Sequence, residues 1–200
     1  MIGWLYDLVG RGVEKGELGA RRHELLSELE GTVLELGAGT GNNLAHYERA
    51  SRVIAVEPDA SMAKQLRKKL PEASVQVEIV QSSADALPFE EAAFDTVVIT
   101  FVLCSVQDPQ TVLAEVRRVL SPGGRLVLLE HVRGEGRIAR WQDRVTPLHR
   151  KLGNCHLNRE TKKEVAAAGF DVAGVHEVLI PGSHRLVRSG IQGVAIKTSS

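Results

Sequence analysis

The sequence predicts an α/β protein whose mostly parallel sheet is covered by helices on both faces. Short, continuously apolar runs alternate with helical patterns over residues 32–129, as is typical of parallel strands buried on both faces. A loop with glycines at alternate positions, Gly37, Gly39 and Gly41, follows the first apolar run. The last two strand-like segments are joined by a loop without a helix, so we expect them to pair antiparallel and to end the sheet in a hairpin.

Residues 1–30 are expected to form an N-terminal helical cap on the domain made by residues 31–200. Leu18, Leu25 and Leu29 belong to an apolar stripe at helical spacing, and Gly31 ends the segment. The first ten residues are apolar but too few to span a bilayer. They could cover a substrate pocket or contact a membrane surface peripherally, and we favour the cap.

From Thr32 onward strands and helices alternate. Ser61 marks the start of a helix that Pro71 stops, and residues 121–124 form a turn before the fifth strand. The expected helices cover residues 43–47, 61–70 and 108–120. The expected strands cover residues 33–36, 52–56, 75–80, 94–100, 125–129, 172–179 and 192–197.

A helical lid is predicted as an insertion at about residues 133–168. Its helical pattern covers residues 139–168 and is expected to break at Pro147 and around Gly153. Apolar side chains at helical spacing either cover an acceptor pocket or belong to the core; these are Trp141, Val145, Leu148 and Leu152.

Composition limits the function classes. Two hundred residues suffice for one domain with a substantial core, and 25 basic side chains balance 25 acidic ones. That balance gives no signature of nucleic-acid binding. Cys104 and Cys155 lie far apart and Cys155 adjoins His156, so no ligand spacing for a metal is visible and we expect none. A reducing cytoplasm is the expected location. The sequence leaves the oligomeric state open.

The glycine loop has the form E-x-G-x-G-x-G, with Glu35 just before the glycines. Glycine allows a positive φ and a close approach of the backbone to a ligand. A carboxylate at Glu35 would repel a phosphate and favour a cationic amino-acid ligand. This spacing resembles motif I of the class I S-adenosylmethionine-dependent methyltransferases. The resemblance implies the Rossmann-like class I methyltransferase fold, with a mostly parallel seven-stranded sheet.

Later strand ends supply the remaining candidate cofactor contacts. Glu57, about 20 residues past the loop, is placed to accept both ribose hydroxyls, and Asp85 could accept from the adenine amine. Residues 87–89 and 94–95 resemble the L-P-F … F-D run of type 11 methyltransferases. We expect Asp95 to orient its strand rather than to bind the ligand. The predicted cofactor contacts are Glu35, Gly37, Ala38, Gly39, Gly41, Asn42, Glu57, Pro58, Met62, Ala84, Asp85, Ala86, Thr100 and Phe101.

Three segments narrow the resemblance. Residues 100–106, 130–132 and 153–161, together with the tail at 186–197, resemble the methyltransferase-like alkyl thiol S-methyltransferases. The resemblance implies a small, lipophilic acceptor, with a thiol as one candidate. This chain departs from the animal members in showing no N-terminal anchor and in having Gly153 and Asn154 where they have Gly-Asp. A second resemblance is to phospholipid N-methyltransferases and quinone C-methyltransferases, which remain alternatives.

His131, at the end of the fifth strand, is the candidate catalytic base because a thiol acceptor must reach its thiolate. A hydrogen-bonded histidine on the rim is the alternative interpretation. Two remote alternatives share parts of the pattern. One is a nicotinamide-dependent oxidoreductase, which the glycine spacing and Glu35 disfavour; the other is a non-catalytic domain that only binds the cofactor.

Overall fold

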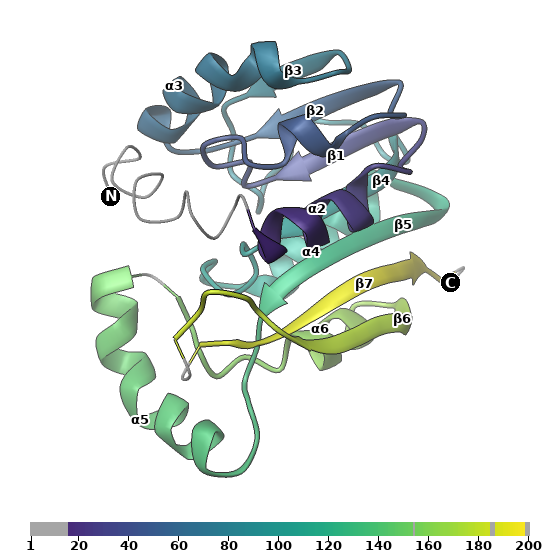
Figure 1. The fold of residues 1–200 in the computed structure, drawn as a ribbon. Helices are drawn as coiled ribbons and strands as arrows, with labels where there is room; N and C mark the ends of the chain where they lie inside the picture. The colour runs from purple at the N-terminus through teal and green to yellow at the C-terminus, as the bar shows by residue number, and fades with distance from the viewer. Residues whose placement is uncertain (1–15, 154, 185–186, 199–200) are drawn as a thin grey trace.

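The computed structural model describes residues 16–153, 155–184 and 187–198, and within residues 147–153 it describes the backbone only. Seven strands form one sheet in the order β3-β2-β1-β4-β5-β7-β6 (Figure 1). The pairs among β1 to β5 are parallel, and β7 lies antiparallel between β5 and β6. The predicted parallel sheet and its terminal antiparallel hairpin are therefore confirmed.

The strand bounds follow the apolar runs closely. Arg52–Val56 and Phe94–Thr100 form β2 and β4 over the expected residues. The fifth strand begins earlier than expected, because Leu120 already pairs with Phe94 before the register shifts across residues 121–124. The other strands are β1 (Thr32–Leu36), β3 (Val77–Val80), β5 (Leu120–His131), β6 (Phe170–Leu179) and β7 (Ser189–Lys197).

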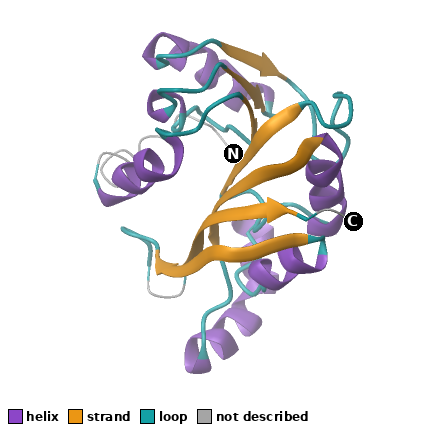
Figure 2. Cartoon of the chain, turned by 90° about the vertical axis from the view of Figure 1, so that its right-hand side faces the viewer, coloured by secondary structure: helices purple, strands orange, loops and turns teal. Residues whose placement is uncertain are grey.

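Helices cover both faces of the sheet (Figures 1 and 2). Side chains of α4 and α6 pack on one face with strand residues such as Leu34 and Leu126. Leu26 of α2 and Leu66 of α3 belong to clusters that include Val33 and Ala55 on the other face. The α-helices are α2 (Glu17–Leu26), α3 (Ala60–Lys69), α4 (Pro109–Val119), α5 (Gly136–Gly153) and α6 (Thr161–Ala167).

Three local expectations were wrong in detail. The helix expected at residues 43–47 is a single 3₁₀ turn, Leu44–His46. Asp59, not Ser61, caps α3, because its carboxylate accepts the backbone N–H groups of Ser61 and Met62. Helix α5 continues past Pro147, since a proline removes one backbone hydrogen bond and this need not end a helix. A short 3₁₀ turn, Leu70–Glu72, follows α3 and contains Pro71.

The predicted cap lies within the described residues only from residue 16 onward, where α2 packs on the sheet. The proposed membrane contact of the first ten residues falls outside them. None of the helices in the described part is both long and apolar enough to cross a membrane.

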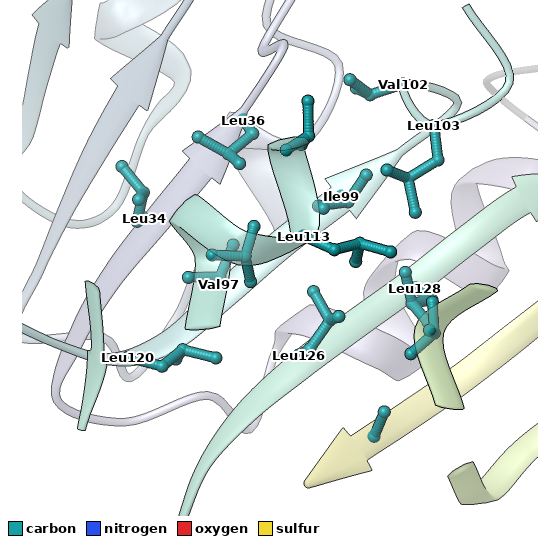
Figure 3. Packing of buried hydrophobic residues seen from close by; sticks show 14 of the residues in the cluster. Leu34, Leu36, Val97, Ile99, Val102, Leu103, Leu113, Leu120, Leu126 and Leu128 are labelled. Carbon is teal, nitrogen blue, oxygen red and sulfur yellow. The ribbon is translucent and has the colours of Figure 1, made fainter. Parts of the chain in front are cut away.

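The main core lies between α4 and the sheet. Leu113 of α4 is fully buried among side chains of β1, β4 and β5 (Figure 3). Its neighbours in that cluster include Val97, Ile99 and Leu126. The strands that carry these side chains also end at the candidate site, so this packing fixes the frame on which the site is built.

Truncating this side chain should destabilise the fold. Leu113→Ala leaves a cavity and should lower the free energy of unfolding by about 2–5 kcal/mol in urea denaturation. Leu179→Ala is the matched control, because Leu179 is 56% exposed, and it should cost less than about 0.5 kcal/mol. Equal losses in the two variants would contradict the assignment of the core.

Candidate active site

The glycine loop after β1 forms the floor of the candidate site. Gly37, Gly39 and Gly41 have φ values of 62°, 58° and 87°, a region that glycine adopts without strain. A Cβ on Gly37 would come within 2.5 Å of Val102, and one on Gly41 within 2.8 Å of Leu66. A Cβ on Gly39 would meet only the Gly37 carbonyl oxygen, at 3.9 Å. Gly39 thus faces open space, as a close approach to a ligand requires.

Glu57 lies against this loop at the end of β2. One carboxylate oxygen accepts the Gly39 N–H at 2.8 Å, and the other accepts the Asp59 N–H at 2.9 Å. The side chain is 6% exposed, and burial raises its pKa against the opposing effect of the two backbone bonds. Each carboxylate oxygen has more than one lone pair, so Glu57 can still accept hydroxyl donors from a ligand.

The other predicted cofactor contacts near the ends of β1 and β2 differ in their exposure and their hydrogen bonds. Ala38 is held by its N–H bond to the Val56 carbonyl. Asn42 accepts a 2.7 Å bond from Lys69 of α3, which directs it toward that helix. Met62 is half-buried in the first turn of α3, and Pro58 is exposed beside Glu57.

The buried carboxylate of Glu35 holds residues that follow the glycine loop. Its side chain is 1% exposed, and its carboxylate accepts bonds from Asn43 and Tyr47, both at 2.9 Å. Burial raises its pKa to about 7, although the Tyr47 and Asn43 bonds and the positive charge of Arg22 oppose the shift. The sequence predicted a direct attraction of Glu35 for a cationic ligand, whereas these contacts direct the carboxylate into the protein.

Arg22 is a site residue that the sequence analysis missed. It is buried in α2, and its guanidinium donates to Asn43 Oδ1 at 2.6 Å and to Thr100 Oγ1 at 3.2 Å. The guanidinium carbon lies 5.5 Å from the centre of the Phe101 ring. A buried positive charge therefore connects the glycine loop to the end of β4. Its only sequence signal was an arginine within the apolar stripe of the first helix.

The segment after β3 is the least enclosed part. Ala84 is half-buried, whereas Asp85 and Ala86 are exposed, so the Asp85 carboxylate is accessible to a ligand. Asp95 lies elsewhere, because its carboxylate accepts the N–H of Thr32, the first residue of β1. The ligand crevice lies at the carboxyl ends of parallel strands, whereas Asp95 contacts the amino end of β1. Asp95 therefore has the orienting role expected of it.

Phe101 connects the two halves of the site. Its φ of 58° is unusual for a residue other than glycine, and such backbone strain gathers at functional sites. Its N–H donates to the Leu129 carbonyl at 2.9 Å. Its ring lies 4.6 Å from the ring of His131, centre to centre. The predicted residues Thr100, Phe101 and His131 are thus brought together.

Two buried charges hold the loop after β4. The Glu130 carboxylate accepts the N–H groups of Val102, Leu103 and Cys104 at 2.6, 2.8 and 3.3 Å. Burial raises the pKa of Glu130 to about 7 in spite of these bonds. The Arg159 guanidinium donates to carbonyls of the same loop, those of Leu103, Val106 and Gln107.

This arrangement brings both cysteines to His131. The Cys104 and Cys155 sulfurs and a ring nitrogen of His131 all lie within 4.8 Å of one another. A hydrogen bond between the two thiols raises the pKa of Cys104 and lowers that of Cys155. The three residues come from three separate segments, so linear spacing could not reveal the cluster.

The predicted lid cover is described only in part. Trp141 of α5 is 55% exposed and Val145 is half-buried. The side chains of Leu148 and Leu152 lie outside the described residues. In Figure 1, α5 projects beyond the end of β5, away from the strands of the sheet.

Comparisons with known proteins agree with this geometry. Residues 34–128 match the family model of the methyltransferase domain. The thiol S-methyltransferase TMT1B of Rattus norvegicus is 37% identical over 205 residues, which cover 95% of this chain and 83% of the relative. The human thiol S-methyltransferase TMT1A is 33% identical over 90% of this chain and 80% of its own.

A quinone-pathway relative matches a shorter part. The ubiquinone/menaquinone biosynthesis C-methyltransferase UbiE of Enterobacter is 43% identical over 105 residues, half of this chain and 42% of the relative. Among solved structures, YcgJ from Bacillus subtilis superposes with a TM-score of 0.71 at 19% identity, over 92% of this chain and 98% of its own. The structural likeness to YcgJ shows a shared fold.

The thiol S-methyltransferase relatives match over nearly the whole chain. The chain therefore belongs to the S-adenosylmethionine-dependent methyltransferases, in the family of the TMT1 thiol S-methyltransferases.

Proposed function

We propose that this chain methylates the sulfur of a small, lipophilic thiol, with S-adenosylmethionine as the methyl donor. The observation that carries the proposal is the rim at the ends of β4 and β5, where Phe101 and His131 adjoin two cysteine sulfurs. This rim lies beside the cofactor half of the site, which consists of the glycine loop and Glu57. The relatives that match over nearly the whole chain are thiol S-methyltransferases, whereas the quinone methyltransferase relative matches half of the chain.

The cofactor fits the residues at the ends of β1 and β2. Open space at Gly39 admits the close approach of a ligand, and the Glu57 carboxylate beside it can accept ribose hydroxyls. S-adenosylmethionine supplies a methyl group activated by a sulfonium sulfur. The chain's own task is to bind, to orient the acceptor and to exclude water.

Arg22 adds a possible contact for the carboxylate of S-adenosylmethionine. Its guanidinium lies between Asn43 of the glycine loop and Thr100 of β4, where a carboxylate of the ligand could meet a positive charge. Glu35 accepts hydrogen bonds from Asn43 and Tyr47 and so helps to hold Asn43 beside Arg22. The adenine contacts at Ala84, Asp85 and Ala86, together with the cytoplasmic location, stay predictions.

The acceptor is tested directly with the purified chain. Incubation with S-adenosylmethionine and a panel of short alkyl and aryl thiols should give methyl thioethers, detected by mass spectrometry. A quinone precursor and phosphatidylethanolamine are tested in parallel. If one of these two is methylated and no thiol is, the acceptor proposal is wrong and the corresponding alternative replaces it.

Gly39→Val should abolish S-adenosylhomocysteine binding in calorimetry. The branched side chain would fill the open space and strain a backbone at φ 58°. Gly123→Val is the matched control, since Gly123 has a φ of 70° and no atom within 4 Å of a built Cβ. The control should bind normally. Normal binding by the folded Gly39→Val variant would show that the ligand does not approach this loop.

Glu57→Ala should weaken S-adenosylhomocysteine binding by about 1.5–3 kcal/mol, the usual range for hydrogen bonds to a charged group. Glu78→Ala, at an exposed position on β3, is the control and should change nothing. A loss of less than twofold in the Glu57 variant would mean that another acid holds the ribose.

A further inference from the structure

We propose that Cys104, His131 and Cys155 bind a zinc ion whose remaining coordination position takes the sulfur of the acceptor thiol. The first half of this inference stands on the side-chain cluster alone. The second half rests on the proposed function, because it assigns the metal a role in activating the thiol.

The donor atoms suit zinc. Two thiolates and one imidazole form a Cys₂His set, which occurs in catalytic zinc sites that leave one position open. Tetrahedral bonds of about 2.3 Å to sulfur and 2.0–2.1 Å to nitrogen put donor atoms roughly 3.5–3.8 Å apart. The three donors here already lie within 4.8 Å of one another, so a small contraction would complete the site.

The backbone holds each donor in place. The Cys104 N–H donates to buried Glu130, and the Cys104 carbonyl accepts the N–H of His156 at 2.6 Å. This second bond fixes the segment of Cys155 beside the loop of Cys104. His131 is the last residue of β5, where the strand is still paired with β7. A preformed cluster of this kind lowers the cost of ordering the ligands around a metal.

The cluster is reachable and adjoins the cofactor half. Cys104 is buried, whereas His131 and Cys155 are half-buried and so leave an approach from outside. His131 packs on Phe101, which follows the cofactor residue Thr100. A thiol bound at the open position would therefore lie at the junction between the metal and the ends of β4 and β5.

Zinc would deprotonate the acceptor thiol, which is the role predicted for His131 as a base. A thiol that coordinates zinc loses its proton, which here passes to solvent, and the sulfur keeps its nucleophilic lone pairs. That sulfur forms a bond to the methyl carbon while the bond between this carbon and the sulfonium sulfur breaks, and the bonding pair stays on the former sulfonium. The product thioether is neutral and a weaker zinc ligand than a thiolate, so it can leave.

The metal half is tested by zinc binding to the full chain. After treatment with a chelator and its removal, the protein should take up one zinc ion per chain, and cobalt in its place should give thiolate-to-cobalt charge-transfer absorption. Zinc binding should weaken by more than about 100-fold in each of the variants Cys104→Ser, Cys155→Ser and His131→Ala. A residue that only hydrogen-bonds to a metal ligand would cost about 10- to 100-fold.

The controls separate binding from folding. His176→Ala, at an exposed position of β6, should keep full zinc affinity. The three cluster variants should keep their circular dichroism and their S-adenosylhomocysteine affinity, since the cofactor contacts lie on other residues. No zinc uptake by the unaltered chain, or full affinity in the cluster variants, overturns the site.

The thiol half has its own readout. Addition of a short alkyl thiol to the cobalt-loaded protein should change the charge-transfer absorption, and an unchanged spectrum overturns the open coordination position. Thiol methylation at full rate by metal-free protein overturns the role of zinc and leaves the proposed function standing. A spectral change without any methyl thioether product supports the metal site and contradicts the proposed function.

Discussion

The buried carboxylate of Glu130 is the constraint on which the acceptor side of this protein depends. A fully buried carboxylate is costly unless its oxygens accept hydrogen bonds, and here three consecutive backbone N–H groups supply them. The loop of residues 102–104 is thereby fixed to the end of β5. Together with the bonds that Arg159 donates to the same loop, this attachment holds Cys104 beside His131.

The cofactor side depends on a second buried carboxylate, at Glu35. It holds Asn43 and Tyr47, and Asn43 in turn accepts from Arg22 of α2. The two carboxylates follow the same design, since each lies at or near the carboxyl end of a parallel strand and organises the loop beyond it. Both have pKa values raised to about 7 by burial. Phe101 lies between the two networks and contacts both Arg22 and His131.

Local patterns were sufficient to predict the sheet and the glycine turn after its first strand. The central strands β1, β2 and β4 lie in short, mostly apolar runs, and the alternating glycines predict a tight turn, at which the structure leaves space beside Gly39. Helix ends were less certain, because Asp59 and Ser61 are both suitable caps and only the bonds made by Asp59 decide between them. Pro147 shows the same limit, since a proline disfavours a helix interior without forbidding it.

The rest of the site could not be predicted because it depends on contacts between distant segments. Arg22 belongs to a stripe that predicts only a packed helix, yet it reaches Thr100. Cys104, His131 and Cys155 have no metal-ligand spacing along the chain, and the bonds that bring them together, from Glu130 and Arg159 to the loop between β4 and α4, join distant segments.

The central claim is that the cofactor half delivers a methyl group to the rim formed by Phe101, His131 and the two cysteines. A crystal structure of the chain with S-adenosylhomocysteine and zinc tests it most directly. The account predicts ribose hydroxyls on Glu57, the cofactor sulfur facing Phe101 and His131, and the metal on Cys104, His131 and Cys155. A cofactor sulfur that faces away from this rim, or a ribose bound far from Glu57, would contradict it.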